Sequence, residues 1–456
     1  MSARDAGAAP LMPGSLLLGS ARDLQRDQLG TYEQAMHDHG DLVRFRIGPP
    51  RLGFEFDAIF DPEGARHVLS GASVGYVKDA PAFTELRRIV GEGLATADGE
   101  RWRRQRRTLQ PLFTKRRVAE YIPLIGERAQ SLVEDLRSDA ARGGETDLRA
   151  ATMTYAANVL GEALFGDDLT TAGPIIADAV PLLNQYAARR GLAPLRLPAS
   201  LPTPANRAAA KAKQSLEDLV DGLVQSRTDR GQTGDFLSLL MEAKDPETGR
   251  GMDTDVIRDE VMVFLLGGNE STGTSLSFAL HALGGHQAVQ DRVRDEVTAV
   301  LGDRVPSADD VEALSFTGQV VDEVLRLYPP VHTLPRRATA DDMLRGHPIP
   351  KGRIVVVSIW GIHRNPKVWE DPQEFRPERF EGSAVADLDR YAYLPFGGGP
   401  RACIGMHFAR AELAIAVATV VRAFQIRSAE RVPRVTAGIA LGPRDRLRCT
   451  FEPLSN

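Results

Sequence analysis

Apolar and polar residues alternate along Asp41–Phe60 (DLVRFRIGPPRLGFEFDAIF), and a Gly-Pro-Pro break interrupts the alternation. A period of two is typical of half-buried strands, so this segment predicts a hairpin or a small sheet. From about residue 99 to residue 244 the pattern is helical in character instead. Turn-forming residues divide this stretch at 143–146, at 166–168 and in a proline-rich connection at 197–206.

The most apolar long helical pattern covers residues 253–283 and opens with Asp253, a residue type that caps helices. Gly267 and Gly268 stand in the middle of its apolar run. Glycine pairs lower helix stability and permit kinks, so their place in this helix requires a reason. A further helix should end at Tyr328, since two prolines follow it.

The last third of the chain mixes both patterns. It predicts a strand at 353–360, a loop around 371–380, a helix from about 406 to 424 and a hairpin within 434–453. Residues 1–14 are rich in Ala, Gly and Pro and predict a disordered tail. We expect residues 15–456 to form one large, mainly α-helical domain with small β-sheets.

Composition narrows the class of protein. The 456 residues carry a formal net charge of -5, which gives no reason to expect nucleic acid as a partner. The apolar runs are shorter than the roughly 20 residues that span a bilayer, and the first residues lack a secretory pattern. Cys403 and Cys449 are the only cysteines, so a disulfide framework is excluded. We expect a cytoplasmic protein with no membrane span.

One of these two cysteines lies in an unusual stretch, FGGGPRACIG, which runs from Phe396 to Gly405. A lone cysteine is most often a small buried core residue. Here, however, glycines allow close approach of the backbone to a ligand, and a helix N-terminus follows the thiol and favours its thiolate. Arg401 could meet an acidic group of whatever the sulfur binds.

The known uses of cysteine differ in the partners that they require. A nucleophilic cysteine needs a histidine base, and structural zinc needs several ligands at characteristic spacing. The sequence suggests neither arrangement. A single thiolate without companion ligands suits an axial ligand of haem iron.

At this point the sequence resembles the cytochrome P450 family. Phe396, Gly399, Arg401, Cys403 and Gly405 match its haem-binding signature F-x-x-G-x-R-x-C-x-G at every fixed position. The resemblance covers the chain from about residue 15 to the end. It implies the P450 fold, haem b as the cofactor, Cys403 as the iron ligand, and Phe396 and Gly405 as parts of the haem site.

Two further groups of residues resemble family motifs. Glu323 and Arg326 look like the E-x-x-R pair, and Arg379 in FRPERF looks like its third member. Residues three apart on a helix share a face, so the first two can form an ion pair. The resemblance implies that these residues are structural and that haem incorporation depends on them.

A second group should contact the haem propionates. Trp102 and Arg106 resemble the family's W-x-x-x-R, and Arg336 stands where many members place another propionate-binding arginine. Arg337 is an alternative to Arg336, because the match is uncertain by one residue. With Arg401, three cations would face two carboxylates.

The glycine pair also finds an explanation in the resemblance. Gly267, Gly268, Glu270, Ser271 and Thr272 resemble the segment in which the distal helix crosses the haem. The small residues would leave room for dioxygen, and the carboxylate and hydroxyl would relay protons. Serine replaces the usual threonine at Ser271, so either Ser271 or Thr272 could supply the hydroxyl.

The resemblance implies a monooxygenase that uses O2 and receives electrons from NAD(P)H through a separate reductase and a ferredoxin or flavodoxin. We expect no fused reductase and a monomer. Basic residues cluster between residues 101 and 117 and could steer an acidic ferredoxin, although such runs are usually only solvated. They are Arg101, Arg103, Arg104, Arg107, Lys115, Arg116 and Arg117.

The predicted substrate is hydrophobic, because the residues expected around the pocket are largely apolar. These are Phe83, Leu86, Val263, Leu266, Val331, Leu334 and Ile439. A terpenoid or polyketide-type specialised metabolite is the favoured class. A fatty acid is the alternative, since Arg87 or Arg88 would suit a carboxylate. A haem-binding protein without oxygenase activity is a third interpretation, against which Glu270 and Ser271 argue.

Overall fold

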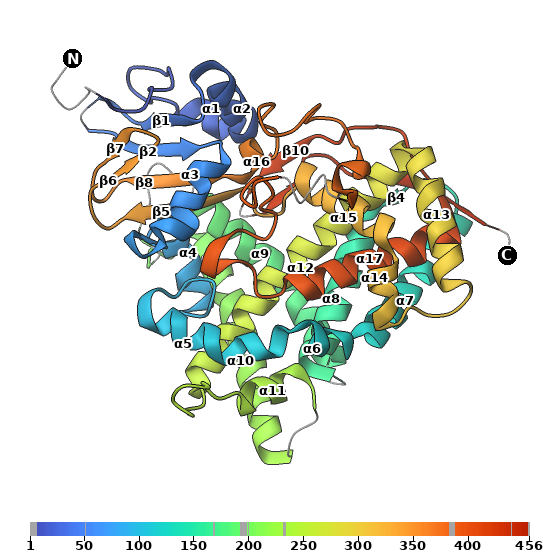
Figure 1. Cartoon of the computed structure of the whole chain (residues 1–456). Coiled ribbons are helices and arrows are strands. Elements are labelled where there is room, and N and C mark those ends of the chain that lie inside the picture. The colour runs from blue at the N-terminus through green and yellow to red at the C-terminus, as the bar shows by residue number, and fades with distance from the viewer. Residues whose placement is uncertain are drawn as a thin grey trace.

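The structure is a computed structural model. It describes residues 7–454 except Arg51, 167–168, 192–197, Ala199, 231–233, 383–387 and Ile439. Helices form most of it, and Figure 1 shows them gathered beside a smaller β portion near the N-terminus. In chain order they are α1 (Ala21–Arg26), α2 (Gln28–His39), α3 (Pro62–Arg66), α4 (Pro81–Val90), α5 (Gly99–Leu109), α6 (Lys115–Ala119), α7 (Ile122–Ala141), α8 (Leu148–Phe165), α9 (Leu169–Gly191), α10 (Pro204–Arg230), α11 (Phe236–Glu242), α12 (Thr254–Gly285), α13 (Gln287–Leu301), α14 (Ala308–Ala313), α15 (Ser315–Leu327), α16 (Ile359–Ile362) and α17 (Met406–Ala423).

The β portion contains one five-stranded sheet with the strand order β1-β2-β8-β5-β3. The predicted hairpin is present, with β1 antiparallel to β2 and Phe45 opposite Phe56. β8 lies parallel to β2, and β5 lies antiparallel to β8. The strands are β1 (Leu42–Ile47), β2 (Phe54–Ile59), β3 (Tyr76–Val77), β4 (Thr146–Asp147), β5 (Thr333–Ala338), β6 (Asp342–Leu344), β7 (His347–Ile349), β8 (Ile354–Ser358), β9 (Phe424–Ser428), β10 (Val435–Ala437), β11 (Leu441–Pro443) and β12 (Arg448–Pro453).

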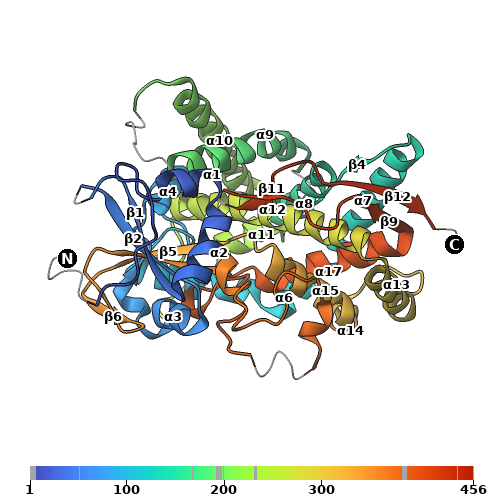
Figure 2. The ribbon, with the colours of Figure 1, turned by 90° about the horizontal axis from the view of Figure 1, so that it is seen from above.

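The long apolar helix α12 crosses the middle of the molecule. Figure 2 shows it between α9 and α10 on one side and α15 and α17 on the other. Leu265, Leu276 and Leu280 on this helix are fully buried, and apolar residues occur around most of its circumference. A helix that is hydrophobic all round belongs in a protein core, which explains its central position. The helix continues through Gly267 and Gly268.

Most predicted elements are present, and three details differ from the predictions. Part of the predicted tail lies along β1, since the Met12 amide donates to the Arg44 carbonyl at 2.8 Å and Ala9 is buried. The predicted strand 353–360 is shorter, because Ile359 begins α16. The C-terminal hairpin is formed by β10 and β11, whereas β12 pairs with β9 and β4.

No helix within the described part of the chain combines the length and apolar character that crossing a bilayer requires.

Candidate active site

A cavity of about 540 Å³ lies between α12 and the loop that precedes α17. Side chains from α4, α5, α8 and β5 complete its wall. The lining is largely apolar, but it also contains four cationic side chains and the thiol of Cys403. Chain segments more than 300 residues apart in the sequence therefore meet at one internal space.

The conformation of the loop before α17 explains two of its glycines. Gly397 has a φ of 70° and Gly399 a φ of 67°, a region that disfavours other residues. A Cβ atom on Gly399 would also collide with the carbonyl oxygen of Leu69. The Cys403 amide donates to the carbonyl of Phe396 at 2.8 Å, which closes the loop. The thiol is thereby held at the cavity, to which it is exposed.

The thiol of Cys403 has two groups nearby that favour its anion. Burial raises its pKa, whereas the backbone N–H of Gly405 and the charge of Arg106 act in the opposite direction. Arg106 itself donates to the carbonyl of Ala402 at 2.9 Å. Among the described residues, no group of three or more His, Cys, Asp or Glu side chains could hold a metal ion. A metal at Cys403 would therefore take its remaining ligands from a cofactor.

Four cations line the cavity: Lys78, Arg106, Arg336 and Arg401. Burial lowers the pKa of Arg336 to about 10 and that of Lys78 well below its usual value. The negative charge of Asp98 raises the pKa of both Lys78 and Arg336 and so opposes the effect of burial. Asp98 also forms an ion pair with Arg401. Lys78 and Arg336 are buried, whereas Arg106 and Arg401 are half-buried. Four cations beside one carboxylate leave an excess of positive charge, and such an excess fits a ligand with two carboxylates.

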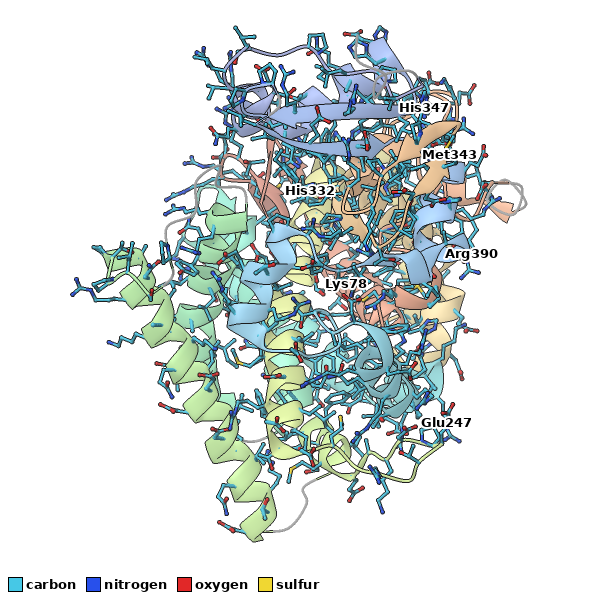
Figure 3. The ribbon with its side chains drawn as sticks, turned by 90° about the vertical axis from the view of Figure 1, so that its left-hand side faces the viewer. Lys78, Glu247, His332, Met343, His347 and Arg390 are labelled. Atoms are coloured by element: carbon cyan, nitrogen blue, oxygen red, sulfur yellow. The ribbon has the colours of Figure 1, made fainter. Side chains whose placement is uncertain are left out.

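Of the two arginines that the sequence offered at positions 336 and 337, the cavity lining contains Arg336. It also contains Lys78, a lysine that the sequence analysis missed. Arg336 is buried and lines the cavity. Arg337 is the next residue of β5 and therefore points to the opposite face of the strand, where it donates to the backbone carbonyls of Asp79 and Gly352. Lys78 donates from Nζ to the carbonyl of Ala95 at 2.8 Å. It belongs to no motif, so no sequence signal could have found it. Figure 3 marks Lys78 near the middle of the molecule.

Trp102 lies at the same side of the cavity. Its ring centroid is 4.3 Å from the guanidinium carbon of Arg401, which is a cation–π contact. The ring therefore helps to fix Arg401 beside the loop. Together, one thiol, this aromatic ring and an excess of cations at the cavity fit a haem group with its two propionates.

The opposite side of the cavity is formed by α12. Gly267, Gly268, Ser271, Thr272 and Ser275 all line it. The Ser271 hydroxyl donates to the carbonyl of Gly267 at 2.7 Å, one turn earlier. Both candidate hydroxyl groups, those of Ser271 and Thr272, are thus at the cavity.

Glu270 lies on a neighbouring face of the helix and is not part of the cavity lining. Its carboxylate accepts a hydrogen bond from Asn184 at 2.5 Å and pairs with Arg149 at 3.5 Å. Leu266, one turn earlier, lies on the same row, and its carbonyl also accepts from Asn184 at 3.5 Å. Leu266 is not among the residues that line the cavity, so its contact with a substrate stays a prediction.

The residues predicted to be structural meet in the core. Arg326 donates to both carboxylate oxygens of Glu323 at 2.7 and 2.8 Å, and both side chains are fully buried. Arg379 donates to the same carboxylate at 3.1 Å. Arg326 also donates to the carbonyls of His363 and Pro372 at 2.8 and 2.7 Å. The cluster thus ties α15 to the segment that leads to the Cys403 loop.

Five of the seven predicted substrate residues line the cavity: Phe83, Leu86, Val263, Val331 and Leu334. Ile439 lies outside the described residues, but its neighbour Gly438 lines the cavity. The sequence analysis missed an aromatic group formed by Phe113, Phe236 and Phe264, whose ring centroids are 5.2 to 5.5 Å apart. It also missed His332, which lines the cavity next to Val331.

The basic run on α5 and α6 is partly balanced by acidic neighbours. Arg107 pairs with Asp245 at 3.0 Å, and Lys115 pairs with Glu312 at 3.0 Å. Further ion pairs of the run are Arg101 with Glu92, Arg103 with Glu100, Arg107 with Glu247, and Arg117 with Glu120. Arg104 donates to the carbonyl of Gly251, and Arg116 is exposed. The run nevertheless borders the Cys403 side, because α6 packs against α17.

Comparisons with known proteins agree with this geometry. The chain is 34% identical over 417 residues to cyclooctat-9-en-7-ol 5-monooxygenase of Streptomyces melanosporofaciens, covering 91% of this chain and 89% of the relative. It is also 34% identical to cyclooctatin synthase of the same organism, covering 97% and 94%. The crystal structure of the cytochrome P450DA heme domain superposes with a TM-score of 0.88 at 26% identity, covering 98% of each chain. The family model "Cytochrome P450" matches residues 10–445. The chain therefore belongs to the cytochrome P450 family.

Proposed function

We propose that this cytochrome P450 monooxygenase inserts one oxygen atom of O2 into a terpenoid, with electrons supplied by a ferredoxin. The observation that supports this most directly is the cavity itself. The Cys403 thiol lies at one side, the small residues of α12 at the other, and apolar side chains enclose the space between them. This arrangement suits a haem held from the thiol side with a hydrophobic molecule above it.

In this proposal Cys403 is the iron ligand, and Lys78, Arg106, Arg336 and Arg401 neutralise the haem propionates. Trp102 positions Arg401 through its ring. The bound haem supplies the oxygen chemistry of the family, in which dioxygen is reduced and one of its atoms reaches the substrate. Protein side chains have the tasks of binding, excluding water and moving protons.

Proton delivery is assigned to α12. Ser271 holds a proton at Oγ within the cavity, and Thr272 offers a second hydroxyl beside it. Glu270 contacts Arg149 and Asn184 on the neighbouring face of the helix, toward α8 and α9. We assign Glu270 the exchange of protons with that side and Ser271 their final delivery.

The terpenoid class rests on the apolar cavity and on the names of two relatives, a cyclooctat-9-en-7-ol monooxygenase and a cyclooctatin synthase. A fatty acid has less support, because the arginines considered for its carboxylate are occupied elsewhere. Arg87 donates to the carbonyls of Lys78 and Thr96 at 3.3 and 2.8 Å. Arg88 pairs with Glu85 at 3.0 Å. Neither arginine lines the cavity.

The test is a titration of the haem-loaded protein with terpenes, terpene alcohols and fatty acids, followed by the low-spin to high-spin shift of the Soret band. Turnover with NAD(P)H, a surrogate ferredoxin and its reductase then identifies the product. We expect saturable spin shifts and an oxygenated product with terpenoids. Shifts with fatty acids alone would contradict the proposed substrate class. A Cys403→Ala variant should lose the long-wavelength absorption of the ferrous carbonyl complex.

A further inference from the structure

His332 is a polar residue in a mostly apolar part of the cavity wall. It directly precedes β5 and lines the cavity together with Val331 and Leu334. Figure 3 marks it in the inner part of the molecule, and only 3% of its surface is exposed. Polar groups at such positions normally have partners, because burying one without a hydrogen bond lowers stability.

One ring nitrogen of His332 has such a partner and the other does not. Nε2 lies 3.0 Å from the carbonyl oxygen of Gly438. Nδ1 is buried and has no hydrogen-bond partner among the described residues. The contact with Gly438 fixes the tautomer: a carbonyl oxygen has no proton to donate, so Nε2 must carry the hydrogen.

The ring is also neutral near pH 7. Burial lowers the pKa of His332, although the contact with the Gly438 carbonyl acts in the opposite direction. A neutral imidazole with its hydrogen on Nε2 presents a lone pair at Nδ1. Nδ1 can therefore only accept a hydrogen bond, and no described residue donates one to it.

Other polar groups of the cavity have different surroundings. The four cations lie near one another and act on one another electrostatically, with Asp98 beside them. The Ser271 hydroxyl already donates to Gly267. Cations offer donors and no acceptor, and a hydroxyl rotates to suit its partner. Two further lining residues have a buried oxygen without a partner among the described residues, Ser275 at Oγ and Glu412 at Oε1. Ser275 is a rotatable hydroxyl of α12, and Glu412 lies on α17, where burial raises its pKa well above the ordinary value, so that the carboxyl carries a proton that it can donate. The His332 ring differs from both, because its contact with Gly438 fixes its orientation and leaves Nδ1 as an acceptor only.

We propose that Nδ1 of His332 accepts a hydrogen bond from a hydroxyl group of the substrate, so that the preferred substrate is a hydrophobic alcohol. This inference rests on the proposed function and narrows its substrate class. Methyl ethers and ketones have no hydrogen to donate, and a carboxylate would place negative charge against the lone pair. One relative carries an alcohol in its name, cyclooctat-9-en-7-ol 5-monooxygenase.

The experiment uses the haem-loaded protein and matched sets of diterpenoids, one acyclic and one cyclic. Each set contains an alcohol, its methyl ether and the corresponding hydrocarbon, such as geranylgeraniol with its ether and its deoxy analogue. Dissociation constants come from titrations of the Soret spin shift. We expect the wild-type protein to bind the alcohol roughly tenfold more tightly than the ether, the factor that one net hydrogen bond supplies.

Three variants locate the preference. His332→Leu should bind alcohol and ether within about twofold of each other. His332→Gln should retain part of the preference, because its amide can donate to Gly438 and accept from the ligand. Thr333→Val is the matched control, since Thr333 also lines the cavity and offers a hydroxyl. It should leave the preference unchanged.

The outcomes separate the two proposals. Equal binding of alcohol, ether and hydrocarbon by the wild-type protein would overturn the role of His332 and leave the terpenoid proposal intact. A preference that survives in His332→Leu or vanishes in Thr333→Val would also overturn it. If no terpenoid shifts the spin state while the ferrous carbonyl complex is normal, the terpenoid proposal fails, and this inference fails with it. The wild-type comparison does not depend on whether the variants fold.

Discussion

The imidazole of His363 joins two backbone segments of the core: Nε2 accepts from the amide of Leu394 at 2.8 Å, while Nδ1 lies 3.0 Å from the carbonyl of Arg326. Burial lowers the pKa of His363 to about 3, so the ring is neutral and can act as donor at Nδ1 and acceptor at Nε2. Leu394 precedes Phe396 by two residues. The ion-pair cluster of Glu323 is thus linked through one side chain to the start of the cysteine loop.

Removing the carboxylate of this cluster should unfold the haem site. Glu323→Ala leaves Arg326 and Arg379 buried without their counter-charge, and breaking a buried pair in this way costs about 3–5 kcal/mol. We expect loss of haem incorporation and a lower free energy of unfolding in denaturant titrations. The control is Arg427→Ala, which removes an exposed ion pair with Glu452 and should cost no more than about 1 kcal/mol. Similar losses in both variants would contradict the structural role.

The two glycines that flank the cysteine should tolerate substitution differently. Gly399→Ala would force a residue with a side chain into a φ of 67° and bring its Cβ into collision with the Leu69 carbonyl. The left-handed conformation alone costs about 1–2 kcal/mol, and the contact requires backbone movement in addition. At Gly405 a Cβ would meet nothing within 4 Å. Haem content of the purified variants should therefore fall for Gly399→Ala and stay higher for Gly405→Ala.

The hydroxyl that delivers protons can be identified from coupling. Because Ser271 bonds to Gly267 within the cavity, Ser271→Ala should lower the product formed per NAD(P)H roughly tenfold. Thr272→Val serves as the comparison, since its hydroxyl belongs to the same wall. Product and peroxide are measured against cofactor consumption. Unchanged coupling in Ser271→Ala with loss in Thr272→Val would move the role to Thr272.

Acid should destabilise the protein partly through His281. Burial lowers the pKa of this histidine to about 4, below its ordinary value of 6.5. Between these values the unfolded chain binds a proton that the folded chain does not, so stability falls as the pH falls. From pH 6.5 to pH 5 this single group should cost about 2 kcal/mol.

The measurement is the free energy of unfolding of the wild-type protein and of His281→Gln at several pH values. Glutamine can still hydrogen-bond to Ser428, the present partner of the ring. The variant should show the shallower dependence on pH over this interval. Parallel curves for the two proteins would assign the acid sensitivity to other groups.

Charge on α6 should control the rate of electron delivery. Reversal at Lys115 and Arg116 removes positive charge next to α17, and we expect reduction by an acidic ferredoxin to slow roughly tenfold at low salt. Arg142→Glu is the control, because it reverses an exposed charge at the end of α7. Stopped-flow reduction of the haem at two ionic strengths measures the effect. Rates that are unchanged and independent of salt would exclude this docking surface.

Local chemistry explains what could be predicted from the sequence alone. The glycines around Cys403 and the i,i+3 spacing of Glu323 and Arg326 act within a few residues, so their pattern indicates their arrangement. The apolar composition of residues 253–283 likewise required a buried helix. The mainly helical class, most of the secondary structure and the unusual character of the Cys403 loop could be expected on these grounds, whereas the fold family and the other haem-site residues were predicted from the resemblance.

Only the tertiary structure decided which neighbouring side chain faces the cavity. Adjacent residues of a strand point to opposite sides, so Arg336 and Arg337 could not be separated before β5 had its partners. On α12, likewise, only the packing of the helix showed that Leu266 is not among the residues that line the cavity. Lys78 and His332 belong to no pattern, because Lys78 meets Arg336 and Arg401, and His332 meets Gly438, only when distant parts of the chain pack together. Long-range packing sets such contacts, and a single sequence does not encode it in any local period.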